Sequence, residues 1–249
     1  MNIDNNKENN TENNSMAVLS YDNSDAFRAR DILLGVFFFF TLLGLGLGIA
    51  INFKPIYYTC IDKYGLEEAS GLSREEIIEN YDALIDYCSP FHFGELAFPT
   101  LKASVSGLSH FAEAKRLMVA FYIIGFISAI FTILGFISRI RNKEIRFYRV
   151  CAITSIAIPL LLGIICMIDF DWLFVIFHKI AFNNDDWLFN PVTDPVITIL
   201  PEEFFMRCLV TILLTIIIGA VTLFVIYICK KRKKRKEGSP LPKQMNFYY

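Results

Sequence analysis

The chain has 249 residues, of which 54% are hydrophobic, and its 24 basic side chains nearly cancel its 25 acidic ones. Length alone allows one or two soluble domains, but the apolar residues are gathered into four uncharged stretches: 32–53, 117–138, 150–168 and 208–229. This distribution excludes a secreted disulfide scaffold, a nucleotide-binding α/β enzyme and a DNA-binding domain as interpretations of the whole chain.

Each uncharged stretch is long enough to cross a hydrocarbon layer of ~30 Å at ~1.5 Å per residue. A soluble core helix is rarely so long and apolar on every side. The sequence therefore predicts an all-α polytopic membrane protein with four transmembrane helices and two folded, mostly helical extracytoplasmic loops, 54–116 and 169–207. The stretches contain no acid, base or histidine, which argues against transport of ions or polar solutes.

The basic residues predict the orientation. Segments 1–31, 139–149 and 230–249 carry 16 of the 24 Lys and Arg, whereas acids outnumber bases in both long loops. The positive-inside rule then places both termini in the cytoplasm. We expect a disordered cytoplasmic tail over 1–30, a membrane domain over 31–229 and a basic cytoplasmic tail over 230–249. The basic tail is interpreted as a stop-transfer anchor, with an anionic-lipid or nucleic-acid patch as the alternative.

The first long loop carries signals for two helices. Ser73 and Glu76 form a capping-box pattern, which predicts a helix over 72–88. Ser109 is expected to cap a second helix, which carries His110 and runs into the second span. Cys60 and Cys88 are the two cysteines clearly outside the membrane, and the sequence leaves open whether they form a disulfide.

The second long loop begins with an aromatic segment, 169–182, that carries His178. Pro201 followed by two acids predicts that the chain re-enters the membrane through a short interfacial helix. In this arrangement His110 and His178 lie at a similar depth near the outer leaflet, while His92 is interpreted as an ordinary interfacial side chain.

Two histidines at one depth are suited to proton transfer. The reference pKa of imidazole is ~6.5, so the ring can take up and release a proton near neutral pH. A metal site formed by His110, Glu113 and His178 is the competing interpretation, although neither HExxH nor paired Cys-x-x-Cys spacing supports it. The sequence contains neither a G-x-S-x-G elbow nor a P-loop.

Both loops carry motifs of a known family. The first loop contains Glu79-Asn80-Tyr81 and then Ser104…Gly107…His110-Phe111…Glu113-Ala114-Lys115. The second contains Phe177-His178, Phe182-Asn183-Asn184-Asp185-Asp186-Trp187, Asp194-Pro195 and Leu200-Pro201-Glu202-Glu203. Over about residues 30–230, the chain resembles the lipoprotein intramolecular transacylases, which are four-span membrane proteins of low-GC Gram-positive bacteria.

The resemblance implies an acyl shift within one molecule. The sn-2 acyl chain of a diacylglyceryl lipoprotein moves to the α-amino group of its N-terminal cysteine and gives the lyso-form lipoprotein. The reaction needs no protein nucleophile, metal or soluble cofactor. The implied partners are the lipoprotein and membrane lipid, with no nucleic acid, and the implied location is the bacterial plasma membrane, with the active site at the outer-leaflet interface.

The family's catalytic pair matches His110 and His178. We expect His178 to act as the base and His110 as the acid or oxyanion partner, with the two roles interchangeable on sequence evidence. The candidate substrate-binding residues are Tyr81, Ser104, Ser106, Asn183 and Trp187. The alternatives are a non-enzymatic membrane scaffold or chaperone and a metal-dependent lipid hydrolase. Oligomeric state, acyl-chain preference and lipoprotein preference stay open.

Overall fold

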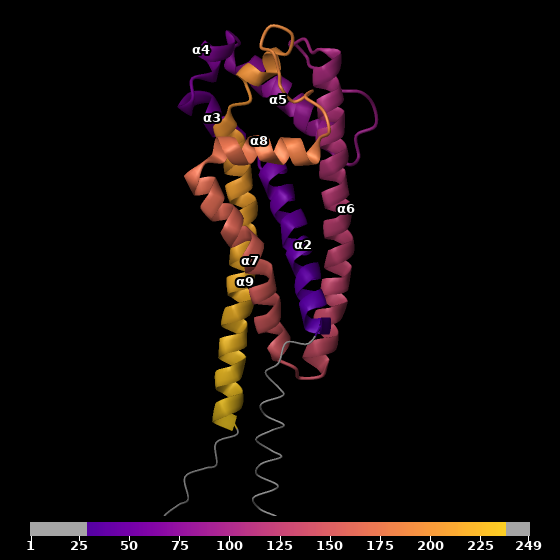
Figure 1. The fold of residues 1–249 in the computed structure, drawn as a ribbon, viewed down its shortest axis with the longest axis vertical. Coiled ribbons are helices and arrows are strands. Elements are labelled where there is room, and N and C mark those ends of the chain that lie inside the picture. Colours follow the sequence, from indigo (N-terminus) through magenta and orange to yellow (C-terminus); the bar gives the residue numbers. More distant parts are fainter. Residues whose placement is uncertain (1–28, 238–249) are drawn as a thin grey trace, which may run out of the picture.

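The computed structural model describes residues 29–237, which form helices and no strand (Figure 1). In chain order the helices are α2 (Ala29–Asn52), α3 (Pro55–Lys63), α4 (Leu66–Ser70), α5 (Arg74–Cys88), α6 (Val105–Arg141), α7 (Arg146–Ile168), α8 (Phe170–Ala181), the 3-10 helix η1 (Pro195–Thr198) and α9 (Glu202–Glu237). The predicted tail 1–30 lies outside the described residues except for Ala29 and Arg30.

Four of these helices, α2, α6, α7 and α9, are long and apolar enough to cross a membrane. This confirms the prediction of an all-α polytopic membrane protein. The 37 residues of α6 correspond to a length of about 55 Å, well beyond the ~30 Å of hydrocarbon. Its first turns therefore project past the membrane at the end that carries the two long loops, here called the loop end. The opposite end, with the α6–α7 turn and the last turns of α9, is called the basic end.

Helix α2 runs through the centre of the bundle and packs against α6, α7 and α9 (Figure 1). Glycines allow two of these approaches. A Cβ atom at Gly44 would lie 2.9 Å from the Cα of Gly125 on α6, and one at Gly46 would lie 3.0 Å from the Cα of Ile212 on α9. Small residues at such crossings let helix backbones approach closely in a membrane.

Helix α7 leads the chain out to the loop end. It contains Pro159, which cannot donate a backbone hydrogen bond and disturbs the turn before it. Figure 1 shows the far half of α7 leaning away from α2, and α8 then crossing the end of the bundle nearly at right angles. Asp169 caps α8 by accepting a hydrogen bond from the Trp172 amide at 2.8 Å.

Above α8, the short helices and the start of α9 enclose a separate core. At its centre the Tyr81 ring stacks on Tyr57 at 3.6 Å between centroids, and Phe204 packs edge-on against both rings. The predicted helix over 72–88 is confirmed as α5, including the capping box of Ser73 and Glu76. Cys60 and Cys88 are buried free cysteines, so the open question of a disulfide is answered in the negative.

Two local predictions were wrong. Ser109 lies inside α6, and the cap is Ser104, whose Oγ accepts a hydrogen bond from the Gly107 amide at 3.0 Å. The short interfacial helix after Pro201 does not stand alone, since α9 runs unbroken from Glu202 to Glu237. In both cases the helix is longer than its local signals suggest.

Candidate active site

The two predicted histidines come from different helices at the loop end. His110 lies six residues after the cap of α6, about 9 Å along that helix. His178 is the buried side chain of α8, whose apolar residues are otherwise partly buried or exposed, the latter including Trp172 (52%) and Ile180 (81%). A helix with this character, lying across a bundle, is typical of a membrane interface. His178 is therefore turned into the protein from a helix that leaves other apolar side chains on the surface.

The structure brings the two imidazoles together. Their ring centroids lie 5.7 Å apart with an interplanar angle of 34°, and the residues are only 7% and 8% exposed. Phe182 and Phe189 pack edge-on against His110 at 4.8 and 5.5 Å, and Trp187 covers His178 at 4.9 Å. This aromatic enclosure keeps the pair close enough to contact one reacting centre.

A backbone contact fixes the proton on His178. Its Nδ1 lies 2.7 Å from the Phe174 carbonyl oxygen, and a carbonyl only accepts, so Nδ1 must donate. In the neutral ring the lone pair then resides on Nε2. Burial lowers the pKa of His178 and outweighs the hydrogen bond to Phe174, which raises it. The lowered pKa favours the neutral form of the His178 ring.

His110 has an unpaired polar atom. Its Nδ1 is buried and has no hydrogen-bond partner within residues 29–237. A buried donor or acceptor without a partner costs about 1–3 kcal/mol, so native structures seldom keep one without a function. A polar group of a bound substrate would satisfy this atom.

The second loop is attached to α6 through Asn184. Its side chain donates to Glu113 Oε2 at 2.9 Å, one turn below His110. Its backbone carbonyl accepts from Trp187 Nε1 at 3.1 Å, and the Trp187 ring lies against His178. One continuous set of contacts thus links α6 to His178 on α8.

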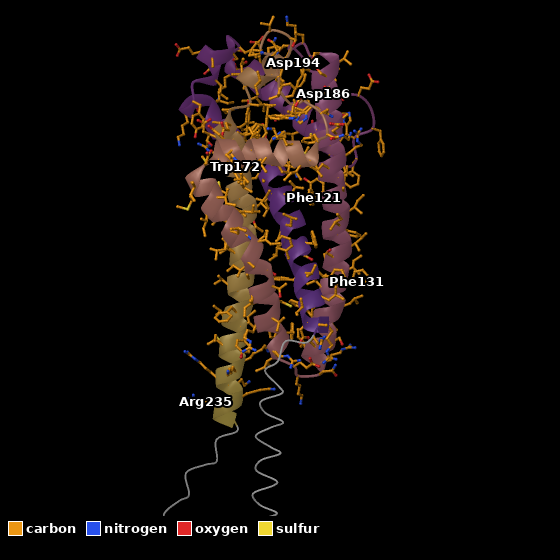
Figure 2. All side chains as sticks on the ribbon, viewed as in Figure 1. Phe121, Phe131, Trp172, Asp186, Asp194 and Arg235 are labelled. Carbon is orange, nitrogen blue, oxygen red and sulfur yellow. The ribbon has the colours of Figure 1, made fainter. Side chains whose placement is uncertain are left out.

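Asp194 makes a second attachment above the pair. Its buried carboxylate accepts from the Ser104 amide and from the Thr193 hydroxyl, each at 2.7 Å. Burial raises the pKa of Asp194, but these hydrogen bonds outweigh burial and the net pKa is lowered. A Cβ atom at Gly107 would overlap with this carboxylate, so glycine is needed there. Figure 2 shows Asp194 and Asp186 in the layer above α8.

The five predicted substrate-binding residues differ in how close they lie to the histidines and in how exposed they are. Trp187 lies beside His178. Ser104 is committed to capping, and Ser106 is exposed, with its Oγ 2.9 Å from that of Ser104. Asn183 is exposed, whereas Asn184 points inward. Tyr81 is 1% exposed in the core beside Tyr57, so its position fits packing instead of the substrate contact suggested by the sequence.

The metal interpretation receives no support from the arrangement of side chains. Within residues 29–237, no three His, Cys, Asp or Glu side chains are grouped as a metal ion would require. Glu113, the third proposed ligand, is instead engaged by Asn184 and by Arg116 at 3.6 Å. His92 lies away from the pair, against Tyr87.

Comparison with known proteins gives the family. Residues 32–205 match the family model of the lipoprotein intramolecular transacylase Lit, while no curated protein matches the chain. The structure resembles the solved membrane-integral lipoprotein intramolecular transacylase Lit from Bacillus cereus. The TM-score is 0.80 and the identity 33%, with 83% of this chain and 96% of that chain covered.

Two further solved structures of the Bacillus cereus protein carry a substituted histidine. The form with arginine matches at a TM-score of 0.73 and 31% identity, covering 93% of this chain and 99% of that one. The form with alanine matches at 0.74 and 33%, covering 83% and 94%. A family of transacylases favours an acyl-transferring enzyme over the scaffold alternative. This chain, integral to the membrane through four apolar helices, belongs to the lipoprotein intramolecular transacylase family.

Proposed function

We propose that this enzyme moves the sn-2 acyl chain of a diacylglyceryl lipoprotein from the glycerol oxygen to the α-amino group of the N-terminal cysteine. The product is a lyso-form lipoprotein with an N-acyl chain. The observation that carries the proposal is the pair of buried imidazoles, one on α6 and one on the interfacial helix α8. A histidine pair enclosed by aromatic rings at the end of a membrane bundle suits a substrate that is half lipid and half peptide.

The chemistry follows from the two protonation states. The α-amino group has a reference pKa of ~8 and attacks only as the neutral amine. Nε2 of His178 accepts a proton from the amine as its nitrogen bonds to the ester carbonyl carbon. Burial and the nearby His178 lower the pKa of His110 to about 4, so its ring is neutral. It donates an N–H hydrogen bond to the developing oxyanion, or it passes the proton taken up by His178 on to the glycerol oxygen as the carbon–oxygen bond breaks. One amide forms, one ester breaks, and the proton passes from nitrogen to the glycerol hydroxyl.

The donor ester and the acceptor amine belong to one molecule, so the enzyme needs few polar groups. Holding two reacting groups in place supplies up to ~7–11 kcal/mol of barrier reduction. The aromatic rings around the histidines also exclude water, which would otherwise hydrolyse the ester. The proposed orientation puts both termini in the cytoplasm and this site at the outer leaflet, supported by the basic residues at the opposite end of the bundle.

The proposal is tested by mass spectrometry of lipoprotein N-terminal peptides from host cells with and without the gene. We expect the diacylglyceryl form without the enzyme and the lyso form with it. If several lipoproteins keep both O-linked acyl chains in the presence of the enzyme, the proposed function is wrong.

The rate of transacylation should depend on pH in a way that reflects the protonation state of His178. Because burial lowers the pKa of His178, its neutral form persists below pH 6.5 and is lost as the pH falls through the lowered pKa. We expect the logarithm of the rate to fall with slope one below the amine pKa of ~8. The slope should then steepen toward two at a pH below ~6.5. His178→Ala should remove only the second change, and steepening above pH 6.5 in the native enzyme would contradict the neutral-base role.

Asn184 is expected to act as a positioning residue. Asn184→Ala removes the hydrogen bond to Glu113 and loosens the contacts that hold Trp187 on His178. Since small misplacements of reacting groups are costly, we expect kcat to fall about 10- to 100-fold while the steepened acid limb persists, because both histidines remain. Asp185→Ala, at the exposed residue that follows Asn184, is the matched control and should keep its activity. Equal losses in both variants would mean a general effect on the loop.

A further inference from the structure

A pocket of about 290 Å³ lies at the basic end, away from the histidines. It is formed where the α6–α7 turn meets the last turns of α9, and its lining consists of four lysines, one glutamate and three apolar or aromatic residues: Ile140, Lys143, Glu144, Ile145, Tyr148, Lys230, Lys233 and Lys234. A water molecule in the liquid takes up ~30 Å³, and a small ion is of similar size. The pocket is therefore large enough for a group bigger than a single small ion.

The charge of the pocket favours an anion. Its one acid, Glu144, is engaged elsewhere, since its carboxylate accepts from Arg139 Nη1 at 2.7 Å and lies 3.3 Å from Arg30 Nη2. Glu144 is therefore not a free counter-ion for Lys143, Lys230 or Lys234 within the lining. A phosphate group offers several acceptor oxygens and so suits a pocket lined by more than one ammonium group.

The pocket is built by tertiary contacts. Lys234 on α9 donates to the backbone carbonyl of Lys143 in the α6–α7 turn at 3.3 Å. Lys230 Nζ lies 5.8 Å from the ring centroid of Tyr148 on α7. These contacts join three elements around one space. Lysines 230, 233 and 234, at spacings of three and four, share one face of α9.

The depth of the pocket points to a lipid. Lys230 directly follows the uncharged stretch 208–229, so the ammonium groups reach headgroup level while their alkyl stems lie along apolar surface. Ile140, which is 51% exposed, adds an apolar side chain to the lining. Figure 2 shows Arg235, one residue beyond this set, at the foot of α9 and far from Asp194.

We propose that this pocket binds the phosphate headgroup of an anionic phospholipid from the leaflet at the basic end. A basic pocket between membrane helices at a positively charged end is typical of such binding. The bound lipid would tie α9 to the α6–α7 turn, independently of acyl transfer at the opposite end.

The test is native mass spectrometry of the full-length protein in a neutral detergent, titrated with phosphatidylglycerol or with phosphatidylcholine. We expect one phosphatidylglycerol per chain, bound more tightly than phosphatidylcholine. The triple variant Lys230→Gln/Lys233→Gln/Lys234→Gln should weaken its binding about 10-fold or more. The matched control Lys231→Gln/Arg232→Gln/Arg235→Gln removes the same charge from the other faces of the same turns and should bind like the native protein.

Three further results of these measurements would contradict the proposal. If both triple variants bind phosphatidylglycerol equally weakly, the lipid is attracted by overall charge and the proposal of a specific pocket is wrong. If inorganic phosphate alone is retained as firmly as phosphatidylglycerol, the ligand is a soluble anion and the proposal of a bound lipid is wrong. If the first triple variant loses its helical circular dichroism, Lys143→Gln tests the pocket from the α6–α7 turn, and unchanged lipid binding by that variant would also overturn the proposal.

Discussion

Replacing His110 or His178 with alanine is expected to lower transacylation by about 10²–10⁴-fold, the usual contribution of a general acid or base. The two ring centroids lie 5.7 Å apart in one enclosure, and in the proposed mechanism both rings serve one proton transfer. The double variant should therefore lose little more than the worse of the single variants. The measurement is the rate of conversion of a diacylglyceryl lipopeptide by purified protein.

His92 provides the matched control, because it lies on the same loop end but packs against Tyr87. His92→Ala should retain the native rate. Full activity in the double variant His110→Ala/His178→Ala would remove the histidine pair from the mechanism. A loss in the His92 variant equal to that in the other two would indicate damage to the fold.

The largest effect on stability is expected from Asp31→Ala at the basic end. Asp31 is fully buried, with its carboxylate oxygens 3.0 Å from Arg139 Nη2 and 3.0 Å from Arg146 Nη2. Removing the shared acid leaves two largely buried guanidinium groups around an empty position. Loss of one partner from a buried ion pair costs about 3–5 kcal/mol. We expect a decrease of that size in the free energy of unfolding, measured by denaturant titration in mixed micelles.

Arg30 is the control for Asp31. Its side chain is 52% exposed and meets Glu144 at 3.3 Å, so Arg30→Ala should change the free energy of unfolding by only about 0–1 kcal/mol. If Asp31→Ala were no more destabilising than this, the buried ion cluster would not hold α2, α6 and α7 together.

The features that could be predicted from the sequence are those that depend only on residues close together in the chain. Transmembrane helices need only length and apolarity, and the capping box of α5 needs only Ser73 and Glu76. The two histidines could be named because imidazole is rare at that depth and both family motifs carry one. Asp31 was missed as an ion-pair residue, since in sequence it is only a charge beside an apolar stretch, and its partners are more than a hundred residues away.

The rest of the site depends on tertiary contacts that no spacing encodes. Ser104 caps α6 in place of Ser109 because Asp194, from the other loop, holds the Ser104 amide. Asn183 and Asn184 are identical in type and adjacent in sequence, so only the fold shows which one faces Glu113. The same holds for Phe182 and Phe189, whose aromatic character fits a membrane interface equally well.

The most direct test of the intramolecular acyl shift is a crossover experiment with purified enzyme. Two diacylglyceryl lipopeptides of different mass are mixed, and only one carries an isotopic label in its sn-2 chain. If the shift is intramolecular, the label moves to the α-amino group of the same peptide and leaves a lyso glycerol there. Label on the amino group of the second peptide, or released as free fatty acid, would contradict it.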